Sequence, residues 1–437
     1  LIDLGYDDVL DNYVVTDSIN NVTYLDVSND SISDLTGIEN FTALTTLHCS
    51  NNQLTTLDVS NNTALTSLGC GNNLLTELDV SNNTALWNLQ PYGNQLTALD
   101  VSNHTALEKL RCHDNELTSL NLTGATALYE VFCYNNQLTA LDVSTNTALE
   151  DLLCDRNQLD TLDVSNNTYL TRLHCYTNSL TSLSVSGATA LTALWCYNNQ
   201  LEALDVSTNT ALTQLYCYNN ELTELDVSSI STLTHLQCGG NQLTILDVNA
   251  NTALTSLGCP LNQLTTLDVS NNTALENLQP YGNQLTSLDV SNNTVLGKLR
   301  CADNQLTILD MSANTDLYDL YCEGNDLSYL NMKNGVTDQL TNFNATSNPN
   351  LTCIETLDLD YATENWTYAN GNIDDGVIFS FICGLTITAI ADTSMDEDSE
   401  LVLQLSAESS QGYDIYFEAQ SDTSSVYAYT DGDMLHI

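Results

Sequence analysis

The stretch LWCYNNQLEALDVSTNTALTQLYCYNN, residues 194–220, decides the fold because it contains one short motif twice. The motif CYNN at 196–199 returns at 217–220, 21 residues later, inside a frame of leucines. Cysteines recur at gaps of 21 or 42 residues along the chain: Cys49, Cys70, Cys112, Cys133, Cys154, Cys175, Cys196, Cys217, Cys238, Cys259, Cys301 and Cys322. Pro91 and Pro280 occupy the two positions of this register that lack a cysteine. The 437-residue chain is therefore a repeat array rather than one compact core.

Each register position lies in the frame L-x-x-L-x-C-x-x-N-x-L-T-x-L-D-V-S-x-N-T-A, which residues 65–85 show in full. This is the pattern of a leucine-rich repeat with cysteine in place of its third leucine. A 21-residue unit cannot close a core alone, so stacked units bury their leucines against one another and form a curved solenoid. We predict an α/β-type solenoid, mostly β-strands and turns, with about 15 units over residues 22–345.

Within each unit, the L-x-C segment is predicted to form a short strand of a parallel sheet on the concave side. Leucine and cysteine then point inward, and the residues between and beside them face solvent. The asparagine three places after each cysteine is predicted to turn the chain and bond the backbone along the ladder. The convex side is predicted to be extended or turn-like. An earlier unit at 24–35 places Val27 in the cysteine position, 22 residues before Cys49.

Charge restricts the partners that this chain can take. Its 56 acidic and 7 basic residues give a formal charge of −49 and a pI near 4.1. A field of that sign repels nucleic acid and anionic lipid headgroups, so we expect neither as a partner. No apolar run of about 18 residues exists, which excludes membrane insertion. Leu1 is not an initiator methionine, and we expect residue 1 to be the edge of a mature or trimmed product.

Residues 24–345 resemble bacterial surface leucine-rich repeat proteins of the internalin family, in which internalin J of Listeria has a 21-residue unit with a cysteine ladder. Repeats written LDVSNNTALTSLGCGNNLLT, at 57–76, also resemble those of secreted flavobacterial proteins. The resemblance implies an extracellular or cell-surface protein, often adhesive, and it supplies no ligand.

The solenoid needs a cap at each end, because terminal units would otherwise expose the core. Residues 1–21 carry apolar residues at roughly helical spacing and are predicted to form the N-terminal cap. The C-terminal cap is predicted over 346–384. Cys353 and Cys383 lie outside the 21-residue register there, and an oxidising exterior predicts a disulfide between them.

The chain after the caps follows a different pattern. Residues 385–437 alternate strand and turn residues and resemble the start of a cadherin-like or immunoglobulin-like β-sandwich module. That module is cut short, so we expect a monomer that is a fragment of a longer surface protein.

The twelve register cysteines are predicted to be free, buried thiols. They lack the C-x-x-C or Cys/His spacing of a zinc site, and parallel neighbours lack the geometry of a disulfide. An aspartate ladder runs through the L-D-V position of most units, as at Asp142 and Asp163. Its carboxylates either bond turn amides and hydroxyls, which we favour, or hold calcium between units. No metal or other cofactor is otherwise expected.

The concave positions lie at −3, −1, +1 and +2 from each register cysteine. They hold six of the seven basic residues, including Lys109, Lys298 and Arg300, and they concentrate aromatic residues. Clusters of arginine and exposed aromatic rings are typical of binding hot spots, and flat rings also suit sugar faces. The predicted ligand-binding residues are Arg111, Phe132, Tyr134, Arg156, Arg172, His174, Tyr176, Trp195, Tyr197, Tyr216 and Tyr218. The alternative is that the rings only stack on cross-strand neighbours for stability.

A second period lies within the first, because the sequence around 65–112 recurs at 254–301, an offset of 189 residues or nine units. No catalytic constellation is found, so we do not expect an enzyme. The sequence predicts an extracellular or cell-surface adhesin or recognition module that binds a protein or polysaccharide on its concave face. Two alternatives stay open. One is a structural spacer or surface-layer component without a specific ligand, and the other is ice or mineral binding by the threonine and asparagine rows.

Overall fold

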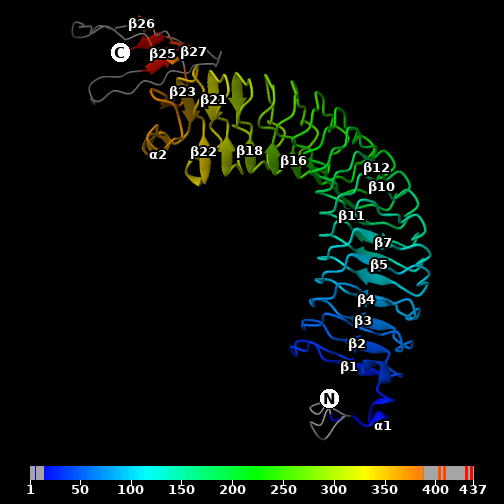
Figure 1. Cartoon of the computed structure of the whole chain (residues 1–437). Helices are drawn as coiled ribbons and strands as arrows, with labels where there is room; N and C mark the ends of the chain where they lie inside the picture. Colours follow the sequence, from blue (N-terminus) through cyan, green and yellow to red (C-terminus); the bar gives the residue numbers. More distant parts are fainter. Residues whose placement is uncertain are drawn as a thin grey trace. The chain divides into compact units, whose positions relative to one another are not determined.

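The structure of the protein is a computed structural model that describes Gly5, residues 14–383 and the backbone of five short strands between 385 and 436. The chain divides into two compact units, residues 1–284 and 285–437. Each unit is a coil of short strands connected by turns (Figure 1). The two units are described in turn.

The first unit is built on one long sheet of three-residue parallel strands, each paired in register with the strand of the next repeat. Leu194 lies opposite Leu215, for example. The strands are β1 (Tyr24–Asp26), β2 (Thr46–His48), β3 (Ser67–Gly69), β4 (Asn88–Gln90), β6 (Lys109–Arg111), β8 (Glu130–Phe132), β9 (Asp151–Leu153), β11 (Arg172–His174), β13 (Ala193–Trp195), β14 (Gln214–Tyr216), β15 (His235–Gln237), β16 (Ser256–Gly258) and β17 (Asn277–Gln279). Tyr24 pairs with Thr46, which confirms the 22-residue spacing of the earliest unit.

The side of the coil away from the long sheet is extended and turn-like, as predicted. It carries two pairs of parallel strands in this unit, β5 (Ala98–Asp100) with β7 (Ser119–Asn121), and β10 (Thr161–Asp163) with β12 (Ser182–Ser184). Helix in the described part of the first unit is limited to α1 (Thr16–Ile19) and the 3-10 turn η1 (Ile38–Asn40). Residues 1–4 and 6–13, where the N-terminal cap was mostly expected, lie outside the described residues.

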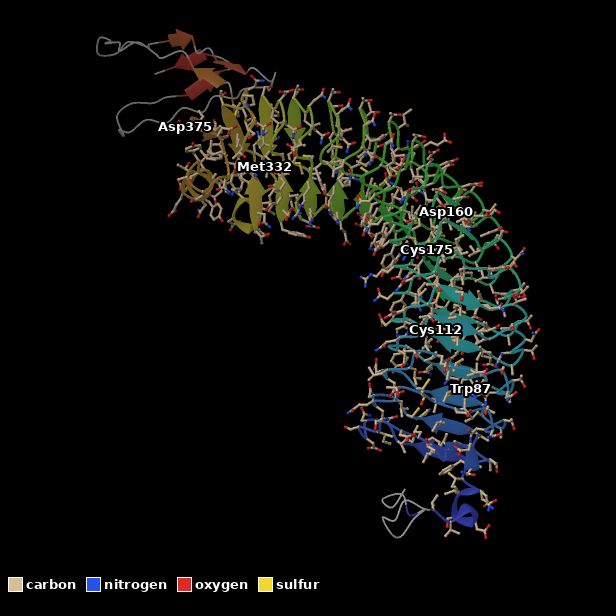
Figure 2. All side chains as sticks on the ribbon, viewed as in Figure 1. Trp87, Cys112, Asp160, Cys175, Met332 and Asp375 are labelled. Carbon is tan, nitrogen blue, oxygen red and sulfur yellow. A yellow bond between two sulfur atoms is a disulfide. The ribbon has the colours of Figure 1, made fainter. Side chains whose placement is uncertain are left out.

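The core runs along the inside of the coil and is made of leucine, valine and cysteine. Leu194, Cys196 and Leu201 have no exposed surface, and equivalent residues of the other repeats are buried in the same way. All twelve register cysteines are buried free thiols. Figure 2 shows Cys112 and Cys175 within the body of the coil. The prediction that the sulfur atoms line its inside is therefore confirmed.

Two ladders of buried asparagine hold neighbouring turns together. In the predicted ladder, Asn199 Nδ2 donates to the carbonyls of Cys175 (3.1 Å) and Cys196 (3.0 Å), and its Oδ1 accepts from Leu180 N at 3.0 Å. A second ladder, which sequence analysis missed, uses the asparagine of the S-x-N-T-A segment. Asn209 Nδ2, for example, donates to the carbonyls of Val185 (3.0 Å) and Ala188 (2.8 Å). In the first ladder each amide bonds backbone groups of its own repeat and of the preceding one, and in the second it bonds two carbonyls of the preceding repeat. Both ladders therefore tie neighbouring repeats together.

The second unit continues the same repeat. Its sheet-face strands β18 (Lys298–Arg300), β20 (Asp319–Tyr321) and β22 (Asn342–Asn344) pair in parallel. On the other side, β19 (Ile308–Asp310), β21 (Tyr329–Met332), β23 (Cys353–Thr356) and β24 (Ile378–Ser380) form a second parallel sheet. The 3-10 turn η2 (Thr337–Gln339) and helix α2 (Leu359–Asn365) complete the elements of this unit up to residue 383.

The C-terminal cap is closed by covalent, aromatic and ionic contacts. A disulfide joins Cys353 to Cys383, with Cα atoms 5.8 Å apart. Trp366 is 3% exposed and its ring centroid lies 4.1 Å from that of Phe343. Glu355 is fully buried, and a buried carboxylate must be paired to remain charged. Its partners are Lys333 Nζ at 2.5 Å, the Tyr329 hydroxyl at 3.0 Å and the backbone N–H of Cys383 at 2.9 Å.

The tail contributes five strands, paired antiparallel. These are β25 (Leu385–Ile387) with β27 (Ala407–Ser409), and β29 (Met434–His436) with β26 (Val402–Gln404) and β28 (Tyr429–Asp431). Most of 388–437 lies outside the described residues, so the immunoglobulin-like or cadherin-like module stays a prediction.

Candidate functional site

The outward side chains of the long sheet form the candidate site. The leucine at the centre of each strand points inward, so its two neighbours point to solvent, as do the two residues after the register cysteine. We call the surface formed by these −3, −1, +1 and +2 positions the sheet face. Most of its aromatic residues lie on the strands from β4 to β14 or in the turns that follow them, and Tyr24, Tyr281 and Tyr321 lie outside this range.

Two adjacent rows of stacked rings occupy the sheet face at β11, β13 and β14. The first row, at position −1, is His174, Trp195 and Tyr216, with successive ring centroids 4.0 and 5.2 Å apart. The second, which we call the tyrosine row, is Tyr176, Tyr197 and Tyr218 at position +1, with centroids 4.4 and 4.3 Å apart. In-register parallel strands impose this stacking, because equivalent side chains of neighbouring repeats stand side by side.

A second aromatic cluster lies on the preceding repeats. Tyr92, His113 and Tyr134 stack with centroids 4.9 and 4.4 Å apart, and the guanidinium of Arg111 lies 5.2 Å from the Phe132 ring centroid. A Cβ added at Gly71 would come within 2.5 Å of the Tyr92 ring, so the ring packs directly over this glycine and a larger residue would displace it. The structure thus gathers the predicted residues into two clusters and adds Tyr92 and His113.

Stacking determines which part of each ring a ligand can reach. Centroids about 4.4 Å apart leave no room for a guest between the rings, so neighbours cover most ring faces. The stacked rings are only partly exposed. The expectation that flat rings offer their faces to sugars is therefore not met inside these stacks.

The arginines of the sheet face are paired rather than free. Arg111 Nε donates to Glu130 Oε1 at 2.8 Å, and Arg172 forms a two-pronged ion pair with Asp151. The hydrogen bonds to these carboxylates raise the pKa of each guanidinium. Over residues 88–219, the four basic residues of the sheet face are balanced by four acidic ones: Lys109, Arg111, Arg156 and Arg172 against Asp114, Glu130, Asp151 and Asp155. The aromatic surface is thus electrically neutral within a chain of charge −49.

Asp155 separates the two aromatic clusters and was not predicted as a site residue. It takes the +1 position between Tyr134 and Tyr176 and is only 3% exposed. Burial raises the pKa of its carboxyl, and a hydrogen bond from Tyr176 opposes the rise. The sequence signal was a single acidic residue interrupting a run of aromatic register positions.

Several features of the two aromatic rows and of the repeat before them are costly for folding. Trp195 Nε1 and His174 Nε2 are buried and have no hydrogen-bond partner among the described residues. Burying such an atom unpaired costs about 1–3 kcal/mol. Arg156 and Thr177 adopt left-handed backbone with φ of 53°, where most other repeats place Asn, Asp or Gly. Side chains other than these are strained there, and strain of this kind concentrates at functional sites.

The nine-unit duplication repeats part of the second aromatic cluster in the second unit. Arg300 pairs with Asp319 at 3.2 Å, and its guanidinium lies 4.9 Å from the Tyr321 ring centroid. These residues are 189 positions after Arg111, Glu130 and Phe132. The stacked His113 and Tyr134 have no aromatic counterpart there, because Ala302 and Glu323 replace them. The two copies share the ion pair but not the stack.

The aspartate ladder has its own hydrogen bonds. Asp163 Oδ1 accepts a hydrogen bond from the backbone N–H of Ser165 at 2.9 Å. The equivalent bond recurs along the ladder, for example between Ser60 N and Asp58 and between Ser312 N and Asp310. Hydrogen bonds from Ser165 lower the pKa of the Asp163 carboxyl, and those from Ser60 lower the pKa of Asp58. Among the described residues, no group of three or more His, Cys, Asp and Glu side chains is arranged to hold a metal ion. Nor does any described helix have the length and apolarity to cross a membrane.

Comparison with known proteins places the chain among leucine-rich repeat proteins. No protein-family model and no curated protein matches it. Among solved structures, the functional domain of InlJ from Listeria monocytogenes, which includes a cysteine ladder, is 31% identical, with a TM-score of 0.67. The match covers 97% of this chain and 86% of that one. The chain belongs to this family of leucine-rich repeat proteins with a cysteine ladder.

Two further solved structures share the repeat fold. A leucine-rich repeat protein of Leptospira interrogans is 23% identical over 71% of this chain and 92% of its own, with a TM-score of 0.55. YopM, a leucine-rich effector protein from Yersinia pestis, is 25% identical over 75% of this chain and 84% of its own, also with a TM-score of 0.55. Family and fold make the chain a solenoid scaffold of the kind that presents an extended binding surface.

Proposed function

We propose that the sheet face between Arg111 and Tyr218 is the ligand-binding surface of an extracellular or cell-surface adhesin or recognition module. Its ligand is a macromolecule, a protein or a polysaccharide. The observation that carries this proposal is the pair of aromatic rows on β11, β13 and β14, which form a neutral surface in a strongly acidic chain.

Residue chemistry supports a binding role. Tyrosine, tryptophan and arginine dominate interface hot spots, and interface cores are depleted of net charge. The paired arginines hold their guanidinium groups in place, so little side-chain entropy remains to be lost when a ligand binds. Membership of the InlJ family and the Cys353–Cys383 disulfide support a location outside the cell.

The rival function is a structural spacer in which the rings only stabilise the sheet. Stacking alone accounts for the ring distances. It does not account for the left-handed backbone of Arg156 and Thr177, where most other repeats place Asn, Asp or Gly. We therefore favour binding over a spacer role.

Neither ice binding nor catalysis gains support from a specific contact. Threonine hydroxyls in the row before the strands donate to the preceding repeat, as Thr192 Oγ1 does to Thr171 O at 3.1 Å, so they serve the ladder itself. The register thiols are buried and their pKa values are raised by burial, so they are unsuited to nucleophilic chemistry. We infer that the chain is not an enzyme.

The test combines truncation of three rings with a matched control. Trp195, Tyr197 and Tyr218 are replaced together by alanine, and the control is Tyr281→Ala, which changes a tyrosine at the same register position outside the two rows. Both proteins are assayed on an array of purified extracellular proteins and on a glycan array. Loss of three hot-spot rings is expected to weaken binding by at least about a hundredfold, and the control to leave it unchanged. Undiminished binding by a folded triple variant would refute the proposal.

A further inference from the structure

The chain leaves the C-terminal cap at Cys383. The strands that follow form sheets of their own, β25 with β27, and β26 and β28 with β29. Because a polypeptide is linear, the backbone that connects these sheets to the cap passes through Cys383. A pull transmitted along that backbone therefore reaches the solenoid at Cys383, and the contacts of this residue decide which part of the solenoid bears the tension.

The disulfide carries such a pull past the loop between its two cysteines. It bonds Cys383 to Cys353, the first residue of β23, over a sequence separation of 30. The Cα atoms of the two cysteines are 5.8 Å apart. Because residues 354–382 form a far longer connection than that, the disulfide takes the tension and the loop stays slack. The loop contains helix α2 and strand β24.

An ion pair ties the same exit to an earlier part of the chain. Lys333, which follows β21, donates from Nζ to Phe381 O at 3.2 Å and pairs with Glu355 Oε2 at 2.5 Å. Glu355 Oε1 accepts from the N–H of Cys383 at 2.9 Å. We call Lys333, Glu355 and the two backbone groups that they bind the exit clasp. It holds the last residues of the cap to the end of β21.

The stability of the cap is a poor explanation for this ion pair. The side chain of Glu355 has no exposed surface, and that of Lys333 is 22% exposed. Taking two charges out of water costs free energy that their attraction only offsets, and apolar residues of similar volume often stabilise a fold as well or better. Charged hydrogen bonds instead add a fixed geometry. Here that geometry holds backbone groups next to the exit.

We propose that the C-terminal cap is a tension-bearing junction, in which the disulfide and the exit clasp pass a pull on the chain beyond Cys383 directly to Cys353 and Lys333. The inference goes beyond the proposed function and rests on the contacts of the cap alone. Each repeat of a solenoid contacts only its neighbours, so a solenoid under tension unravels from its ends. The junction prevents this at the C-terminal end by keeping the tension out of the loop that would peel off first.

Single-molecule force spectroscopy on the full chain tests the proposal. The chain is held between an azide-bearing residue in place of Ser287, which is exposed, and the C-terminus. Under constant force, Cys353→Ala/Cys383→Ala should release the loop before any repeat, and the oxidised wild type should not. The 30 residues of the loop extend by about 100 Å, against about 70 Å for a 21-residue repeat. A variant that unravels in the same order and with the same lifetime as the wild type overturns the proposal.

Asp358→Ala is the matched control for cap stability. Asp358 Oδ1 caps α2 by accepting the N–H of Tyr361 at 2.9 Å, and both residues lie in the loop that the disulfide bypasses. Loss of this cap weakens the helix. It should leave the lifetime of the oxidised chain under force unchanged, and shorten that of Cys353→Ala/Cys383→Ala about fivefold. A shortened lifetime in the oxidised chain would mean that the loop bears tension, which overturns the proposal.

The exit clasp is tested by Glu355→Gln and by Lys333→Met, each with the disulfide intact. Each change should shorten the lifetime of the last repeat under force about tenfold or more, because a bond between the exit and the end of β21 is lost. Amide exchange without force identifies the variants that fold. If a folded variant of each residue keeps the wild-type lifetime, the clasp does not bear tension and that part of the proposal is wrong. None of these measurements uses a ligand, so their failure is distinct from failure of the proposed function.

Discussion

His174 stacks on Trp195 with ring centroids 4.0 Å apart and ring planes 6° from parallel. Burial, helped by the nearby charge of Arg172, lowers the pKa of His174 from 6.5 to about 4. The imidazole is therefore neutral at physiological pH, and the row at position −1 is uncharged.

Acid should weaken the fold through this histidine. Above pH 6.5 the ring is neutral in both states, and between pH 6.5 and about 4 only the unfolded chain takes up the proton. The contribution of His174 to stability is thus full above pH 6.5 and is lost as pH falls through that window. Urea unfolding at pH 7, 5.5 and 4.5 should show a smaller acid loss for His174→Phe than for the wild type. Equal losses would show that His174 is not the group that titrates.

Replacing residues with left-handed backbone should raise stability, and inside the proposed site it should also weaken binding. Leu261, like Arg156, has φ of 53° where asparagine or glycine is usual. Leu261→Asn should raise the free energy of unfolding by about 1 kcal/mol, because asparagine tolerates this conformation better. It should leave binding unchanged, since it lies outside the aromatic rows.

Arg156→Asn is the matched change inside the site. Relief of the same strain should again stabilise the fold, by less than at Leu261, because the guanidinium contact with the Tyr176 ring is lost. Binding should weaken. The denaturant midpoints and the array binding of Leu261→Asn and Arg156→Asn test this prediction. If Arg156→Asn binds as well as the wild type, the strained backbone at Arg156 does not serve binding.

The repeat was predictable because its signal is summed over many copies. One leucine at a given position says little, but the recurrence of Leu194 at Leu215 and beyond determines which face of each strand is buried. The asparagine after each register cysteine was predicted for the same reason. The second ladder, with Asn209, was missed because an asparagine in S-x-N-T-A fits turn chemistry as well as a buried amide.

For the site, the sequence predicted the positions of the residues but not their contacts. The spacing placed Tyr176, Tyr197 and Tyr218 on one face, but it could not show that their rings stack and cover each other. That depends on side-chain rotamers. The pairing of Arg172 with Asp151 joins neighbouring repeats and was hidden because each residue was considered within its own unit. Asp155 was overlooked because a single acidic residue is unremarkable in a chain with 56 of them.

The register cysteines should be inert in the native protein. Cys175 is fully buried, and burial raises the pKa of its thiol well above the usual range. A thiol reagent at pH 8 should therefore label no register cysteine until denaturant is added, and then label twelve. Cys175→Ser should lower the free energy of unfolding by about 2 kcal/mol, because it buries a hydroxyl group. Cys175→Ala is the control for the loss of side-chain volume. Rapid labelling of the folded chain would contradict a buried ladder.

The disulfide of the C-terminal cap should stabilise that cap specifically. Cys353 and Cys383 are 30 residues apart. Closing such a loop lowers the entropy of the unfolded chain and raises the free energy of unfolding by about 3 kcal/mol. Cys353→Ala/Cys383→Ala should speed amide exchange in β23 and β24 and leave strands near Trp195 unaffected. Glu355→Gln should act on the same region, because it weakens the pair with Lys333 and leaves a buried amide in its place. Uniform loss of protection along the solenoid would show that the cap does not act locally.

The aspartate ladder should depend on hydrogen bonds rather than on calcium. The Asp163 carboxylate accepts from Ser165 N, and an asparagine side chain offers an oxygen in the same place. Asp163→Asn should change the free energy of unfolding little, whereas Asp163→Ala should lower it by about 1 kcal/mol through loss of the turn bond. Millimolar calcium should leave the melting temperature of all three proteins unchanged. A rise with calcium that disappears in Asp163→Asn would instead mean that the carboxylate is a metal ligand, and that the turn bond seen here gives way when the ion binds.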